Sequence, residues 1–138
     1  MIDRINKLSP SAKAIWGKMN VAQMLAHCNV TYEMVYENKH PKPGAFMKFI
    51  LKTLVKPSVL NEKPYRNNGK TSPAFIITDE RVFETEKNRL INFIKEIQQL
   101  GEANFDSKES HSFGFLNKTE WNNMFYKYLN HHLSQFGV

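Results

Sequence analysis

Two histidines, His27 and His132, combine a residue type that can do chemistry with a place on an apolar helix face. At about 100° per residue, one face of the last helix carries Trp121, Phe125, Tyr128, His132 and Phe136. An imidazole in a core needs a partner for each ring nitrogen, or a metal. His27 borders the apolar stripe of the first main helix. If the two helices are neighbours, both rings face one cavity, which is a usual beginning of a metal site in a helical bundle.

A tetrahedral catalytic metal takes three protein ligands and leaves one position open. Tyr128 stands one turn before His132, where a histidine would complete an i, i+4 pair. His131 lies about 100° round the helix from His132 and is not expected to bind the same ion. Glu86, on the apolar stripe of the third helix, and His111, in a loop, are candidates for a ligand or an acid/base group.

Each of these residues also has an interpretation without chemistry. His132 would then be a core histidine hydrogen-bonded to Tyr128 or to the backbone. Glu86 would reach solvent along its stem, and His111 would be an ordinary loop residue. Cys28 lies on the main apolar stripe, which favours an unreactive core thiol.

Four helical segments must position these residues, and no convincing strand is predicted. The first opens at the N-cap Asn20 with a capping box to Gln23, and the fourth opens at Asn117 with a capping box to Glu120. A short helical turn within 9–19 is expected to pack Ile15 and Trp16 inward. The second segment runs over 45–55 and ends before Pro57, and the third starts near Thr78 and ends at Gly101. The stretches 58–77 and 102–116 are predicted to be irregular.

The chain of 138 residues, with 41% hydrophobic and 23% charged residues, suits a single domain over 1–138 with one core. Helices with single apolar stripes indicate an all-α four-helix bundle with long connections. No apolar run is long enough to span a membrane, and the first residues, Met1 to Lys7, are not expected to form a signal segment. One cysteine excludes an internal disulfide framework, so a reducing cytoplasm is expected.

Positive charge gathers in residues 39–70, where eight lysine and arginine residues face one glutamate, a net +7 within a total of +6. Such a segment could steer anions towards the molecule, or it could be a solvated lysine face. Nucleic-acid binding is the weaker hypothesis, because no DNA- or RNA-binding motif accompanies the lysines.

Two blocks carry a resemblance to a known family: WGKMNVAQMLAHC over 16–28, and HSFGFL, EW and YKYLNHHLSQFG between 111 and 137. They resemble the DinB-like four-helix proteins, and more specifically an uncharacterised bacterial subfamily of them. The resemblance implies a bundle with a long crossover, often a homodimer. It also implies a divalent metal, commonly zinc or nickel, held by three histidines, at positions that match His27, Tyr128 and His132. Tyr128 departs from that pattern at a ligand position.

Two functions are therefore expected as alternatives. One is a metal-dependent enzyme of the DinB-like type, either a hydrolase or a thiol-dependent transferase, with His27 and His132 as metal ligands. The other is a non-catalytic bundle that binds a small molecule and has lost a competent metal site. In both, the pocket would draw on Glu86, His111, Trp121, Phe125 and His131, and the substrate is not given by the sequence.

Overall fold

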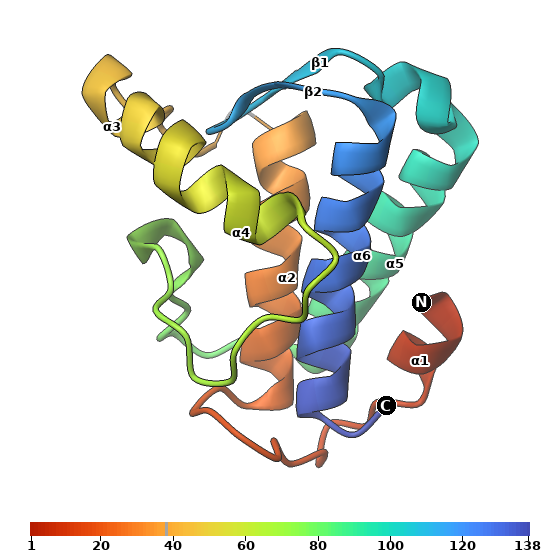
Figure 1. Cartoon of the computed structure of the whole chain (residues 1–138). Coiled ribbons are helices and arrows are strands. Elements are labelled where there is room, and N and C mark those ends of the chain that lie inside the picture. The colour runs from red at the N-terminus through yellow and green to blue at the C-terminus, as the bar shows by residue number, and fades with distance from the viewer. Residues whose placement is uncertain (38) are drawn as a thin grey trace.

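The computed structural model describes residues 1–37 and 39–138 and shows a mostly helical chain (Figure 1). Its three long helices are α2 (Val21–Tyr36), α5 (Phe83–Leu100) and α6 (Lys118–Gln135). The shorter elements are α1 (Ile2–Asn6), α3 (Ala45–Ile50), the π-helical η1 (Leu51–Val55), α4 (Lys56–Leu60) and the 3-10 turns η2 (Pro73–Phe75) and η3 (Glu102–Phe105). The predicted all-α class with long connections is confirmed.

Both predicted capping boxes are present, and they set where α2 and α6 begin. The Asn20 side chain accepts from the Gln23 amide, and the Gln23 side chain accepts from the Asn20 amide. Asn117 and Glu120 repeat this exchange at the start of α6. Each box satisfies two backbone donors that would otherwise lack a partner in the first turn.

Helix α2 is the central element, and it is buried on nearly all sides. It packs most extensively against α5 and also contacts α6 (Figure 1). Even Ala26 and the charged residue Glu33 are buried. The core around α2 includes Leu25, Tyr32, Leu90, Trp121, Phe125 and Leu133. Polar side chains on α2 therefore need partners on neighbouring elements.

The predicted second helix is longer than expected and is divided into α3, η1 and α4. We call this unit, residues 45–60, the arm; it extends beyond the three long helices in Figure 1. The prediction that it ends before Pro57 was wrong. Pro57 lies in the first turn of α4, where a missing N–H costs little.

Three further predictions were wrong for local reasons. Helix α5 begins at Phe83 rather than near Thr78, because Asp79 pairs with Arg81 ahead of the helix. Ile15 is 68% exposed instead of packing inward. The stretch 102–116 is not wholly irregular: β1 (Lys108–Ser110) and β2 (Gly114–Leu116) form an antiparallel hairpin, with Glu109 opposite Phe115. Strands of three residues are too short to leave a period-2 pattern.

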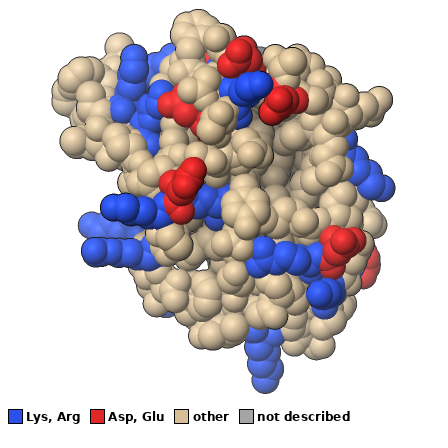
Figure 2. Space-filling model, turned by 45° about the vertical axis from the view of Figure 1, so that its right-hand side comes forward, with Lys and Arg blue, Asp and Glu red and all other residues tan. Residues whose placement is uncertain are grey.

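Basic side chains project at several separate places in the space-filling view, and acidic ones lie beside some of them (Figure 2). Lys48 pairs with Glu109 at 2.7 Å and Lys56 with Glu120 at 3.1 Å, so part of the basic segment is neutralised locally. Among the helices that the structure describes, none combines the length and hydropathy that a bilayer-spanning segment requires.

Candidate functional site

His27 of α2 and His132 of α6 meet inside the molecule. Their Nε2 atoms are 3.0 Å apart, and the ring centroids are 4.5 Å apart with the planes inclined at 73°. Both side chains are buried. The two helices are therefore neighbours with their histidines opposed, as the face assignments predicted.

The second nitrogen of each ring identifies which tautomer is present. His27 Nδ1 lies 2.7 Å from the carbonyl oxygen of Phe75, which can only accept, so Nδ1 carries the proton. His132 Nδ1 lies 3.1 Å from Gln135 Oε1. The Gln135 amide cannot be turned round, because its Nε2 donates to the Trp16 carbonyl at 2.7 Å. His132 Nδ1 is therefore also a donor.

Both Nε2 atoms are consequently acceptors when the rings are neutral, and they face each other. Burial lowers the pKa of His27, and burial followed by the charge of His27 lowers that of His132 to about 3. Near pH 7 no proton is available between the rings. Two opposed lone pairs at 3.0 Å repel unless a cation lies near both. Nitrogens that are each about 2.1 Å from one ion lie about 3.0–3.4 Å apart, so this spacing fits a shared divalent cation.

Tyr128 lies beside the pair but does not point at the Nε2 atoms. Its ring stacks on His27, with centroids 5.5 Å apart and planes inclined at 18°. Its hydroxyl donates to the backbone carbonyl of His27 at 3.3 Å, and burial raises its pKa well above the usual value. This protonated phenol supports the His27 ring and does not occupy the third ligand position that its place in the sequence indicated.

Within residues 1–37 and 39–138, no group of three or more His, Cys, Asp or Glu side chains is arranged to hold a metal ion. A cation at the histidine pair would thus have two protein nitrogens, and its other positions would be filled by water or a ligand. Those positions open into a pocket of about 620 Å³ that both histidines line. The volume lies within the range of roughly 300–1,000 Å³ that is typical of small-molecule sites.

Three of the predicted pocket residues line this pocket: His111, Trp121 and His131. His111 Nδ1 is 2.9 Å from Ser112 Oγ, and its Nε2 is 3.3 Å from the carbonyl of His40. The His131 ring packs edge-on to Tyr65 with centroids 5.6 Å apart, and burial lowers its pKa. These contacts do not direct a nitrogen of His111 or His131 towards His27 and His132.

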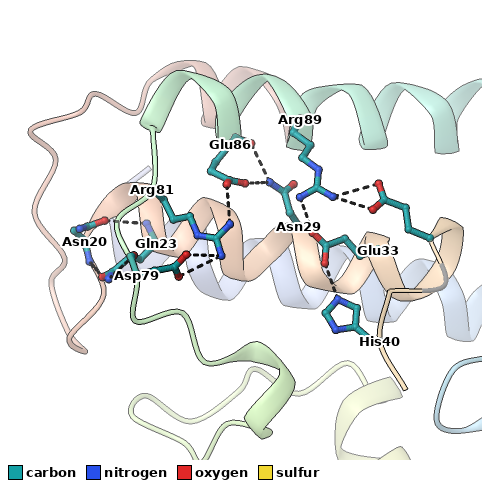
Figure 3. A network of polar contacts seen from close by, with 10 residues as sticks. Asn20, Gln23, Asn29, Glu33, His40, Asp79, Arg81, Glu86 and Arg89 are labelled. Atoms are coloured by element: carbon teal, nitrogen blue, oxygen red, sulfur yellow. Dashed lines mark hydrogen bonds and ion pairs between the residues drawn. The ribbon is translucent and has the colours of Figure 1, made fainter. Parts of the chain in front are cut away.

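Phe125 and Glu86 were predicted to belong to the pocket and do not line it. Phe125 is a core residue whose ring stacks on Tyr32 at 5.2 Å. Glu86 neither reaches solvent nor faces the histidines. Its carboxylate accepts from Asn29 Nδ2 at 2.8 Å and from Arg81 Nη1 at 3.4 Å, between α2 and α5 (Figure 3).

Sequence reasoning missed Phe75, Gln135 and Gly17, which control the direction of the two rings. Phe75 acts through its carbonyl, which no side-chain pattern reveals. Gly17 has φ +85°, and a Cβ built there would lie 2.5 Å from Gln135 Nε2. The glycine therefore leaves room for the amide that orients His132. The one available signal was that Gln135 stands three residues after His132, on an adjacent part of the same face.

Cys28 takes no part in this site. Its thiol lies 3.7 Å from Met24 Sδ, and burial raises its pKa far above the usual value. A thiol that stays protonated is a poor nucleophile.

The fold and the site together define a class: a helical bundle with two opposed histidines at the base of a pocket. The chain belongs to the DUF1569 family, described as a protein of unknown function, which matches residues 1–137. No curated protein and no solved structure matches the chain.

Proposed function

We propose that this protein is a metal-dependent enzyme in which His27 and His132 hold a divalent cation, such as zinc or nickel, and the pocket receives a small-molecule substrate. The observation that carries the proposal is the facing of two Nε2 lone pairs at 3.0 Å, while each Nδ1–H is held by an oxygen acceptor. Ligating histidines commonly donate their other N–H to a carbonyl, which fixes the tautomer and raises the basicity of the ligating nitrogen.

We also propose that the family belongs to the wider DinB-like superfamily. Support comes from the helical fold with long connections and from the meeting of His27 and His132, which lie in the two sequence blocks that carry the resemblance. Membership would bring with it the expectation of a homodimer, which light scattering of the purified protein would check. A shared fold does not determine the reaction. Whether the protein is a hydrolase or a thiol-dependent transferase therefore depends on the chemistry of the site.

A divalent cation at such a site lowers the pKa of a bound water or thiol and so supplies a nucleophile near neutral pH. The residues of this chain contribute position and environment. The carbonyl of Phe75 and the amide of Gln135 hold the two rings in the ligating tautomer. The stacked Tyr128 ring supports the plane of His27, and apolar side chains make up much of the surrounding pocket wall.

A second function, non-catalytic binding of a small molecule, is favoured by one specific observation. Tyr128 stands where a third histidine would be expected, and its hydroxyl is already engaged with the backbone. In that case the histidine pair would be a polar floor for a ligand, and no ion would be retained.

Metal binding separates the two functions. Protein purified without a histidine tag would be stripped with chelator, dialysed and titrated with zinc and nickel by calorimetry. We expect one ion per chain, and we expect His132→Ala to weaken binding by at least about 100-fold, since one of two protein ligands is lost. His131→Ala is the matched control, because the neighbouring imidazole lines the same pocket without facing His27. If neither ion binds the unsubstituted protein, the metal-dependent function is wrong and non-catalytic binding is left.

A gain-of-function variant sharpens the same test. Tyr128→His would place a third imidazole one turn before His132, and we expect it to tighten metal binding by about 10-fold or more. Tyr128→Phe keeps the stacked ring without adding a ligand and serves as its control. Equal affinities for the two variants would count against a cation centred on this pair.

A further inference from the structure

A row of aliphatic side chains from the arm contributes to the wall of the histidine pocket. Met47, Leu51, Val55 and Val59 line it at intervals of four residues. In a regular α-helix, positions four apart drift by about 40° each, so such a row would turn away from the pocket within three steps. The π-helical turn Leu51–Val55 has more residues per turn, which keeps the row aligned. This apolar wall is thus continuous along the arm.

The charged groups of the pocket are all basic. Arg66 and Lys70 line it from the long connection after the arm, and both are exposed, which places them at the solvent edge. Among the residues that the structure describes, no aspartate or glutamate contributes to the lining. The buried histidines lie at the opposite, inner end. The pocket therefore combines buried histidine nitrogens, an aliphatic row along the arm and positive charge at exposed side chains.

We propose that the ligand of this pocket is an organic anion with an aliphatic body, of which a medium-chain carboxylate is the simplest example. The aliphatic row would cover the body of the ligand, and Arg66 and Lys70 would attract its charge. The inference rests on the proposed function only in taking the histidine pocket as the binding site. The aliphatic row and the rim cations do not depend on a metal, so the ligand binds metal-free protein as well.

Calorimetry with four probes tests this on full-length protein kept in chelator. Octanoate carries both features, butyrate has the charge on a shorter body, octanol lacks the charge and octylammonium reverses it. We expect octanoate to bind best. Butyrate is expected to bind about 100-fold more weakly, because four buried methylenes are lost. Octylammonium should bind at least about 10-fold more weakly than octanoate, since it meets only positive charge.

Variants on the arm and the rim have matched controls. Leu51→Gln places an amide in the aliphatic row and is expected to weaken octanoate binding about 10-fold. Phe49→Gln changes a residue of the same arm that is 64% exposed and does not line the pocket, so it should change nothing. Lys70→Gln should weaken octanoate several-fold while leaving octanol unaffected, and Lys52→Gln, which lies outside the lining, should affect neither.

Equal binding of octanoate, octanol and octylammonium would overturn the charge assignment, and no binding of any probe would overturn the inference as a whole. Either result can occur while zinc or nickel still binds through His132, in which case the proposed metal site stands alone. Octanoate binding that persists in chelator and in His132→Ala, while neither metal binds, would support the inference and leave the metal-dependent function wrong.

Discussion

Two buried polar clusters lie on different sides of α2, and they differ in whether their main acceptors face donors or face each other. On the side towards α5, Glu33 meets Arg89 at 2.6 Å and His40 at 2.6 Å, and Glu86 meets Asn29 and Arg81 (Figure 3). Every carboxylate there has a donor, while two other buried atoms of the cluster, Asn29 Oδ1 and Arg81 Nε, have no hydrogen-bond partner. On the side towards α6, His27 and His132 turn two acceptors towards each other.

The difference separates a cluster that stabilises the fold from one that is set up to bind. A network in which every carboxylate has a donor, called the matched cluster below, holds α2 against α5, and removing one member takes hydrogen bonds away from its buried partners. Two acceptors that face each other contribute little to the free energy of unfolding. They can be satisfied by a bound species that both can contact, such as a cation. Substitutions in the two clusters should therefore separate loss of stability from loss of binding.

The largest effect is expected from Glu86→Ala. The side chain is buried, and its removal takes one of two acceptors from the Asn29 amide, which keeps the Glu86 carbonyl, and one of two carboxylates from Arg81, which keeps Asp79. We expect a cost of about 2 kcal/mol in the free energy of unfolding. Urea denaturation followed by circular dichroism measures this. Zinc and nickel affinity, corrected for the unfolded fraction, should be unchanged.

His132→Ala provides the opposite pattern and should destabilise metal-free protein much less than Glu86→Ala does. A larger loss for His132→Ala would show that the histidine pair supports the fold, and the contrast between the clusters would fail.

Gln135→Leu comes next in expected size. Without the amide, His132 Nδ1–H loses its acceptor and the ring is free to take the other tautomer or to turn. We expect metal affinity to fall by about 10–100-fold, as is usual when the hydrogen-bond partner of a ligating histidine is removed. Gln135→Glu retains an acceptor at the same place and should recover most of the affinity. If Leu and Glu behave alike, Gln135 does not orient the ring.

The pH dependence of the stability of metal-free protein tests whether burial keeps the imidazole of His132 neutral. The pKa of His132 in the folded protein, about 3, is below the unfolded value of about 6.5, so between these values the unfolded chain binds more protons. Its contribution to the stability of metal-free protein is complete above about pH 6.5 and is lost as the pH falls towards 3. The slope is at most about 1.4 kcal/mol per pH unit for one histidine.

Denaturation of metal-free protein at pH 7, 6 and 5 measures that slope, and His132→Ala should be less steep. The same slope in both proteins would mean that the imidazole is not kept neutral by burial.

The smallest effect is expected at the exposed edge of the matched cluster. Glu37 pairs with Arg89 at 3.0 Å and also with Lys39, but it is partly exposed, and these pairs are screened by water. Glu37→Gln should change the free energy of unfolding by less than about 0.5 kcal/mol in 0.15 M salt. A change as large as that of Glu86→Ala would show that burial does not set the strength of this network.

Features that depend on neighbours in the sequence were predictable. The capping boxes of α2 and α6 are local hydrogen-bond exchanges, so Asn20, Gln23, Asn117 and Glu120 identified both helix starts. Because the starts were right, the face assignments were right, and His27 and His132 could be placed opposite each other. The family that the chain belongs to has no known function, so membership supports the fold but does not give an activity.

Features that depend on a contact partner distant in the sequence were not predictable. Asp79 would suit a first helical turn, yet it pairs with Arg81, and its carbonyl accepts from Gln23 of α2 at 3.4 Å. Glu86 was expected to reach water because its partner, Asn29, lies 57 residues away in the chain. The second helix was expected to end before Pro57, but a π-helical turn precedes this residue and Pro57 falls in the first turn of α4.

Gln135 is held by three consecutive residues of the loop before α2. The amide of Ile15 donates to its carbonyl at 2.8 Å, the carbonyl of Trp16 receives its side-chain donor, and Gly17 leaves the space that this side chain fills. The backbone conformation of this surface turn therefore determines which nitrogen of His132, more than a hundred residues away, carries the proton. Redesign of that turn, even for a purpose as remote as solubility, would reset the chemistry of the pocket floor.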